Sequence, residues 1–172
     1  RVAKMNMIVH DDGHTNVISY DALDSIDKMH EHNRGFEEGK FDLILNHPPP
    51  SDQRSILRRN HILQIMNWAT HMMRRGRPSL VKPELEILFI ERIWDFLKPG
   101  TGKAAIVLPD GVLTNSSSQY VRDYILEKFQ LLAVVSLPQH AFAHFGAGVK
   151  ASIIFVRKRK TSEKADPDEA IF

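Results

Sequence analysis

The residues best suited to chemistry lie where an apolar run gives way to polar and rigid residues. Residues 41–45 are almost continuously apolar, as in a strand covered on both faces, and two polar residues and three prolines follow them. An amide oxygen and a neutral imidazole can each accept a hydrogen bond, and consecutive prolines hold the backbone in one extended shape. In open α/β sheets, ligands bind beyond the carboxyl ends of the strands. Chemistry is often placed at such an edge, so the candidate catalytic residues are Asn46, His47, Pro48, Pro49 and Pro50, although the same residues also fit a stiff turn after a buried strand.

A long basic connection follows the prolines. Residues 51–83 carry several arginines, and Asp52 is their only acidic residue. Clustered arginines beside a binding edge suit contacts with nucleic-acid phosphates, although a solvated basic loop has the same composition. The candidate DNA-binding residues are Arg54, Arg58, Arg59, Arg74, Arg75 and Arg77.

Composition limits the class of protein. The chain has 172 residues, of which 42% are hydrophobic, and this is enough for one domain with a buried core. It contains no cysteine, so disulfides and thiolate chemistry are excluded, and it has no apolar stretch of the ~18 residues that a membrane span needs. Histidines recur at four-residue spacing at 10 and 14 and at 140 and 144, but no further ligands complete a set, so we predict no metal site. We expect a cytoplasmic protein.

The spacing of apolar residues predicts alternating strands and helices. Strands are expected at residues 16–20, 41–45, 103–108, 131–137 and 150–156. Helices are expected at residues 1–9, 22–32, 84–97 and 116–129. Parallel neighbours need a crossover of a dozen or more residues, usually helical, and residues 138–149 contain no convincing helix. The last two strands are therefore expected to be antiparallel.

This order of elements favours a three-layer α/β domain with a mostly parallel sheet. We expect the domain to occupy residues 1–160 and residues 161–172 to form a polar, frayed tail. The basic residues 157–160 are expected to keep the end of the last strand soluble. Because the sequence opens at Arg1 on what looks like the end of a helix, we expect part of the protein to precede it.

Several segments, in order, resemble the catalytic domain of the modification subunit of type I restriction enzymes, which are N6-adenine DNA methyltransferases. The proline run is similar to their Asp/Asn-Pro-Pro-Tyr/Phe signature, with His47 in place of the acidic or amide residue and Pro50 in place of the aromatic residue. The similarity extends over residues 5–158 and includes segments 89–100, 105–113, 120–123, 134–138 and 145–150.

The resemblance implies a Rossmann-like, three-layer, S-adenosylmethionine-dependent methyltransferase fold, partial in this sequence. It places Asp21 and Ala22 near the adenine of S-adenosylmethionine, and residues 46–50 around a target adenine rotated out of the duplex. Adenine N6 is a poor nucleophile because its lone pair is delocalised into the ring, and acceptors aimed at its hydrogens favour attack on a sulfonium methyl group. The implied partners are double-stranded DNA, a sequence-recognising specificity subunit and a restriction subunit.

Two other functions remain open. The changes at His47 and Pro50 also fit a non-catalytic DNA-binding or assembly module whose motif has degenerated, and the glycine-rich cofactor loop of the family is expected upstream of Arg1. Transfer of a labelled methyl group to adenine would favour the enzyme, whereas salt-sensitive DNA binding without transfer would favour the module. A nicotinamide-dependent dehydrogenase is disfavoured, because the sequence has no Gly-x-Gly-x-x-Gly.

Overall fold

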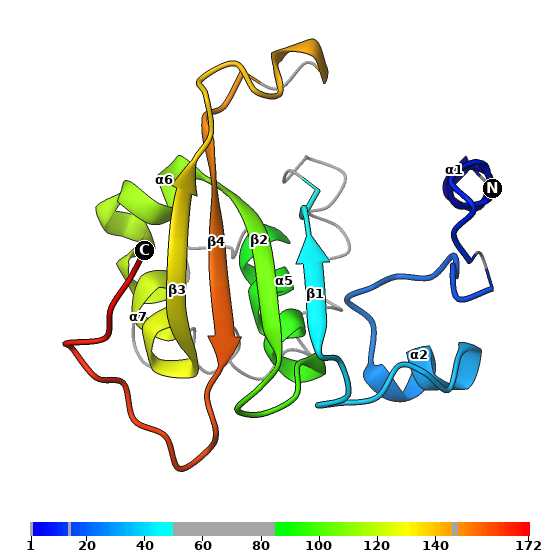
Figure 1. The fold of residues 1–172 in the computed structure, drawn as a ribbon, viewed down its shortest axis with the longest axis horizontal. Helices are drawn as coiled ribbons and strands as arrows, with labels where there is room; N and C mark the ends of the chain where they lie inside the picture. Colours follow the sequence, from blue (N-terminus) through cyan, green and yellow to red (C-terminus); the bar gives the residue numbers. More distant parts are fainter. Residues whose placement is uncertain (1, 14, 50–84, 146–147) are drawn as a thin grey trace. The chain divides into compact units, whose positions relative to one another are not determined.

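The computed structural model describes residues 2–13, 15–49, 85–145 and 148–172, which belong to two units divided after Glu37. The first unit contains two helices, α1 (Val2–Val9) and α2 (Ile26–His32), shown in Figure 1. Helix α1 confirms the helix expected at the start of the sequence.

The strand predicted at residues 16–20 is wrong, because this segment forms turns and irregular backbone. A β-branched run becomes a strand when it can pair with another, and the described residues of the first unit contain no strand. The helix predicted from residue 22 begins only at Ile26. A local turn precedes it, in which the Asp21 carboxylate accepts a hydrogen bond from the Leu23 N–H at 3.1 Å.

The second unit is built on a four-stranded sheet with the order β1-β2-β4-β3. Strand β1 is parallel to β2, whereas β4 is antiparallel to both of its neighbours. Three strands therefore share one direction and the last strand runs against them, which confirms the mostly parallel sheet with an antiparallel last strand. The strands are β1 (Leu43–Asn46), β2 (Lys103–Pro109), β3 (Phe129–Ser136) and β4 (Ala151–Lys158).

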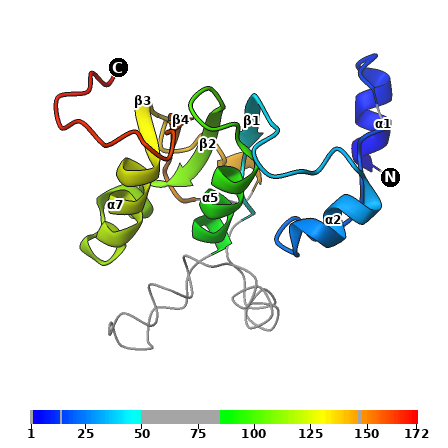
Figure 2. The ribbon, with the colours of Figure 1, turned by 90° about the horizontal axis from the view of Figure 1, so that it is seen from below.

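Two helices cover one face of this sheet. Helices α5 (Leu85–Phe96) and α7 (Gln119–Lys128) lie on the same side in Figure 2, and the short α6 (Asp110–Thr114) follows β2 directly. Every second residue of β2 is buried toward them, and each buried aliphatic side chain contributes about 1.5–3 kcal/mol. The core includes Ile87, Ile90, Ile93, Leu97, Ala104, Ile106, Leu108, Val121, Ile125, Phe129, Ile154 and Val156.

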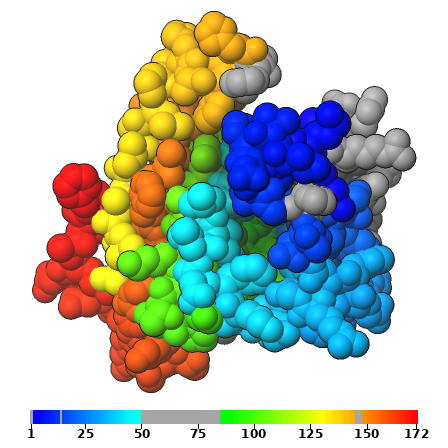
Figure 3. Space-filling view, turned by 45° about the vertical axis from the view of Figure 1, so that its right-hand side comes forward, coloured from blue at the N-terminus to red at the C-terminus, as the bar shows by residue number. Residues whose placement is uncertain are grey.

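The opposite face of the sheet carries exposed apolar residues. Leu43 is 60% exposed, Leu45 is 76% exposed and Phe155 is 37% exposed, and the cyan atoms of the β1 region lie at the surface in Figure 3. Within residues 38–49, 85–145 and 148–172, the helices longer than five residues are α5 and α7, which lie on the other face. These residues thus supply the sheet and one helical layer of the expected three-layer fold.

The C-terminal end of β4 corrects two expectations. Lys158 and Arg159 are buried instead of solvating the strand end, because each finds acceptors inside the fold. The Lys158 ammonium donates to the Trp94 carbonyl at 2.6 Å and lies 4.3 Å from the centre of its ring. The tail is not frayed either, since the Arg159 guanidinium donates to the Glu169 carboxylate.

Candidate active site

The described candidate catalytic residues lie at one edge of the sheet. We call it the carboxyl edge, because the C-terminal ends of β1, β2 and β3 meet there. Parallel pairing sets Asn46, the last residue of β1, opposite Ile106 of β2. Because successive strand residues point to opposite faces, Asn46 shares the helix-covered face with Ile44, which packs against the core. The Asn46 side chain is half-buried there.

The residues after Asn46 differ in exposure. Pro48 is buried, whereas His47 and Pro49 are exposed, and Pro50 lies outside the described residues. The rigid proline backbone is thus anchored at one ring, while the imidazole is presented to solvent. The structure therefore brings Asn46 and His47 to one edge, on different sides of the strand end.

An aromatic ring lies against His47. The ring centroids of His47 and Phe142 are 4.9 Å apart, and the two planes are inclined by 34°. Phe142 belongs to the connection between β3 and β4, which extends beyond the strand ends in Figure 1. Sequence reasoning missed this residue, although the topology contains the signal. Strand β3 runs in the same direction as β1, and β4 runs the opposite way. The connection between β3 and β4 therefore begins and ends at the carboxyl edge, where the β1 motif also lies.

Three polar residues join β2 to β4 at this edge. The Ser152 hydroxyl donates to Asp110 Oδ1 at 2.7 Å, and Lys150 Nζ lies 3.3 Å from Asp110 Oδ2. The Asp110 N–H also donates to the Lys150 carbonyl at 3.0 Å. Asp110 is the first residue of α6. Its contacts fix the end of the connection that carries Phe142.

The other predicted site residues lie outside the described part of the second unit. Asp21 and Ala22 belong to the first unit, where Asp21 makes the turn contact with Leu23. All six candidate DNA-binding arginines lie outside the described residues. The roles of these residues remain predictions.

In the described parts of the chain, no group of three or more histidine, aspartate or glutamate side chains is placed to hold a metal ion. None of the described helices combines the length and apolar character needed to cross a membrane.

Comparisons with known proteins agree with this architecture. A chain from a structure on complex assembly and conformational transition of the type I R-M system has 27% identity and a TM-score of 0.63, over 91% of this chain and 28% of that one. The type I restriction-modification methyltransferase subunit from Streptococcus thermophilus has 27% identity and a TM-score of 0.61, over 93% and 31%. The M protein of the type I restriction enzyme EcoKI has 22% identity and a TM-score of 0.58, over 96% and 30%, and its likeness shows the fold alone.

These similarities confirm the Rossmann-like methyltransferase fold that the sequence resemblance implied. The chain spans about a third or less of the length of these chains, which are covered to 28%, 31% and 30%. A family profile described as N-6 DNA Methylase matches residues 1–171, which is nearly the whole sequence. The chain therefore belongs to the N-6 DNA methylase family.

Proposed function

We propose that this chain is the target-base part of a DNA adenine-N6 methyltransferase, within the modification subunit of a type I restriction-modification system. One observation carries the proposal: the proline motif after β1 and an aromatic ring from the β3–β4 connection meet at the carboxyl edge of the sheet. The family match and the likeness to type I methyltransferase subunits support it. Such a protein acts on cellular DNA, and we place it in the cytoplasm.

In this proposal, residues at the end of β1 hold the amino group of an adenine that has left the duplex. Neutral His47 accepts one N6 hydrogen, and the backbone carbonyl between the prolines accepts the other. Both bonds orient the nitrogen lone pair away from the ring plane, so that it can attack. Bound S-adenosylmethionine would supply an electrophilic methyl group on a sulfonium, S-adenosylhomocysteine would leave as the carbon–sulfur bond breaks, and the displaced N6 proton would pass to water. The half-buried Asn46 amide braces the strand end from the helix-covered side.

Phe142 supplies the aromatic surface that the motif itself lacks. A base that has left the stack loses its neighbours, and an aromatic side chain restores part of that contact. Pro50 offers no such ring, whereas Phe142 is half-buried with its ring against His47. We assign the stacking role to Phe142 for that reason.

The cofactor and the remaining partners follow from the same proposal. A carboxylate accepts hydrogen bonds from amino or hydroxyl groups, so Asp21 is chemically suited to the adenosine part of S-adenosylmethionine, with Ala22 beside it. The arginines between residues 54 and 77 would contact the phosphates of double-stranded DNA. The specificity and restriction subunits of a type I complex are the proposed protein partners.

The second candidate function is that of a non-catalytic protein with the same fold. His47 and Pro50 replace two residues of the methyltransferase motif, which favours a non-catalytic DNA-binding or assembly module. Transfer of label from S-adenosylmethionine distinguishes the two functions. It is measured on a duplex that contains adenine and on a matched duplex in which every adenine already carries an N6 methyl group. We expect label on N6 of adenine in the first duplex alone. Salt-sensitive binding of both duplexes without transfer would overturn the enzyme assignment and establish the module.

A further inference from the structure

The connection between β3 and β4 has a one-sided charge. Residues 137–150 contain no aspartate or glutamate, and Lys150 is their only lysine or arginine. The same connection carries Phe142, the ring that lies against His47. A segment without acidic residues can approach the phosphates of a duplex without repulsion. Lys150 is the residue of this segment best suited to bind one.

The backbone of Lys150 is fixed at the carboxyl edge. Strand β4 begins directly after it, at Ala151, which pairs with Pro109 at the end of β2. The Lys150 carbonyl accepts a hydrogen bond from the Asp110 N–H at 3.0 Å. At the other end of the connection, the Leu137 N–H donates to the Ala151 carbonyl at 3.1 Å. Both ends of the connection are thus bonded to the sheet.

A carboxylate orients the side chain of Lys150. Its Nζ lies 3.3 Å from Asp110 Oδ2, while Asp110 Oδ1 accepts a hydrogen bond from the Ser152 hydroxyl at 2.7 Å. Ser152 is only 5% exposed, so the carboxylate is fixed by a group inside the fold. The ammonium of Lys150 therefore meets a partner whose position is already set.

Lys150 reaches the side of the sheet on which Asn46 lies. Ile106 of β2 lies opposite Asn46 of β1 and also opposite Ile154 of β4. Ser152 precedes Ile154 by two residues and is buried with it on the helix-covered face. The bond to Ser152 through the carboxylate brings the Lys150 ammonium to that side, beyond the strand ends. A base held at residues 46–49 must bring its flanking phosphates to the same edge.

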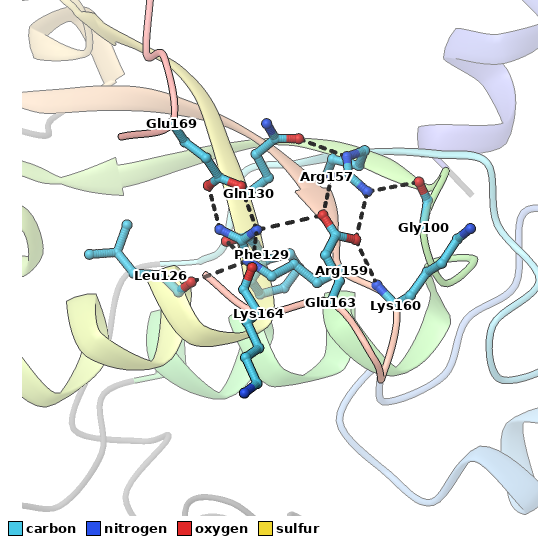
Figure 4. A network of polar contacts seen from close by, with 10 residues as sticks. All are labelled: Gly100, Leu126, Phe129, Gln130, Arg157, Arg159, Lys160, Glu163, Lys164 and Glu169. Atoms are coloured by element: carbon cyan, nitrogen blue, oxygen red, sulfur yellow. Dashed lines mark hydrogen bonds and ion pairs between the residues drawn. The ribbon is translucent and has the colours of Figure 1, made fainter. Parts of the chain in front are cut away.

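The cations at the opposite end of the sheet are saturated by the fold, as Figure 4 shows. The Arg159 side chain is 3% exposed and donates to the Phe129 carbonyl and to the Glu169 carboxylate. Arg157 donates to the Glu163 carboxylate from both terminal nitrogens. Cations that are bonded in this way hold the structure and have few donors left for a ligand.

Lys150 differs from these cations in what its ammonium has left. Its side chain is 40% exposed, and Asp110 is its one polar side-chain partner in the described part of the chain. An ammonium has three donors, and 3.3 Å is longer than the ~2.7–2.9 Å of a strong charge-assisted bond. The carboxylate therefore orients Lys150 without saturating it.

We infer that Lys150, oriented by Asp110, binds a phosphate of the DNA backbone beside the target base. The inference rests on the proposed function, because it requires a duplex whose base occupies the carboxyl edge. It adds a backbone contact from β4 to the base contacts proposed for His47 and Phe142.

The salt dependence of DNA binding tests this contact. The full-length protein is compared with Lys150→Met and Lys150→Arg on a duplex that the wild type selects from a random-sequence pool. Each phosphate contact contributes about 0.9 to the slope of log affinity against log salt concentration. We expect the slope to be smaller by about 0.9 in Lys150→Met and unchanged in Lys150→Arg, which keeps the cation.

Lys98→Met is the matched control. Lys98 is 41% exposed and pairs with Asp42 Oδ1 at 2.6 Å, at the opposite end of the sheet, where β1 begins. It therefore loses the same charge from a similar ion pair away from the carboxyl edge. Its slope should equal that of the wild type, because a phosphate contact depends on position as well as charge.

Neutral phosphates then locate the contact. Each phosphate of the selected duplex is replaced in turn by an uncharged methylphosphonate. We expect at least one position where the replacement weakens binding of the wild type and leaves binding of Lys150→Met unchanged. If circular dichroism shows Lys150→Met to be unfolded, Lys150→Gln replaces it, with the same expected result.

Three results in a folded variant would overturn the inference while the proposed function stands. These are an unchanged slope in Lys150→Met, an equal loss of slope in Lys98→Met, and no methylphosphonate position that separates Lys150→Met from the wild type. Failure of the wild type to select any duplex would overturn the inference and the proposed DNA binding together. Binding without methyl transfer would overturn only the enzyme, since the slope and the methylphosphonates still decide the role of Lys150.

Discussion

The two ends of the sheet in the second unit handle charge in opposite ways. At the end of β4, Arg159 is 3% exposed and its guanidinium donates to a carboxylate and to backbone carbonyls. At the carboxyl edge, His47 is exposed and Lys150 remains 40% exposed beside Asp110. Buried, fully bonded charges fix a structure, whereas exposed polar groups beside a rigid backbone are available to a ligand. Substitutions at one end should therefore change stability, and substitutions at the other should change activity.

The largest effect is expected from Arg159→Met. The methionine keeps the aliphatic stem but removes the donors to Phe129 and Glu169, and breaking a buried ion pair costs about 3–5 kcal/mol. We expect urea unfolding to show a loss of about 3 kcal/mol, since Glu169 is partly solvated. DNA binding of the folded fraction should be unchanged.

Lys128→Met is the control for this variant. Lys128 is the last residue of α7, directly before β3, and it is 36% exposed and paired with Glu127. Surface ion pairs of this kind contribute about 0–1 kcal/mol to stability. An equal loss of stability in both variants would show that the buried end has no special role in the fold.

The buried carboxyl of Asp95 should make the stability of the second unit depend on pH. Burial raises the pKa of its carboxyl to about 6, against the opposing charges of Arg92 and Lys158 and with the support of Glu91. The folded state then binds more protons than the unfolded chain between about pH 4 and 6, so stability falls as the pH rises through this window. The shift of roughly two pKa units corresponds to about 3 kcal/mol at about 1.4 kcal/mol per unit. Because the Asp95 side chain is 22% exposed, solvent screens part of this, and Asp95→Asn should raise stability at pH 7 by about 2 kcal/mol and flatten the profile.

Urea unfolding at several pH values checks this expectation. The wild type should lose stability between pH 4 and 6 relative to Asp95→Asn, and the two curves should run in parallel above pH 7. Parallel curves throughout would mean that Asp95 is not the titrating group.

The directions of the strands could be predicted from sequence, whereas the contacts between them could not. The proline and glycine at 99 and 100 mark the end of α5, and the absence of a long helix after Ser136 implied the antiparallel finish. The strand order β1-β2-β4-β3 depends on pairing energies between segments that are distant in the sequence. The spacing of apolar residues predicts the strands and helices but gives no information about these energies. The contacts of Phe142 with His47 and of Arg159 with Glu169 follow from that order, so sequence reasoning missed both.

At the carboxyl edge, Phe142→Ala should lower methyl transfer. Stacking of a base on an aromatic ring contributes about 1–3 kcal/mol, so we expect kcat/KM for DNA to fall by about tenfold to a hundredfold. Phe142→Tyr keeps the ring and should retain most of the activity. Stability should change by less than about 0.5 kcal/mol in either variant, as for surface substitutions. A loss of stability as large as that of Arg159→Met would remove the contrast between the two ends.

The smallest effect is expected from His47→Asn, and it acts in the favourable direction. An amide oxygen accepts a hydrogen bond whatever the pH, whereas imidazole accepts one only in its neutral form, and one net hydrogen bond is worth about 0.5–1.5 kcal/mol. We expect kcat for methyl transfer to rise by up to about tenfold, with KM for DNA little changed. The hydrogen bond to the amide oxygen strengthens in the transition state, where the amino nitrogen becomes positive, and such an interaction changes kcat more than KM. His47→Ala, which removes the acceptor, should lower kcat. Equal rates in both variants would show that the side chain before Pro48 does not touch the target base, and the reaction would then depend on the backbone and on Phe142.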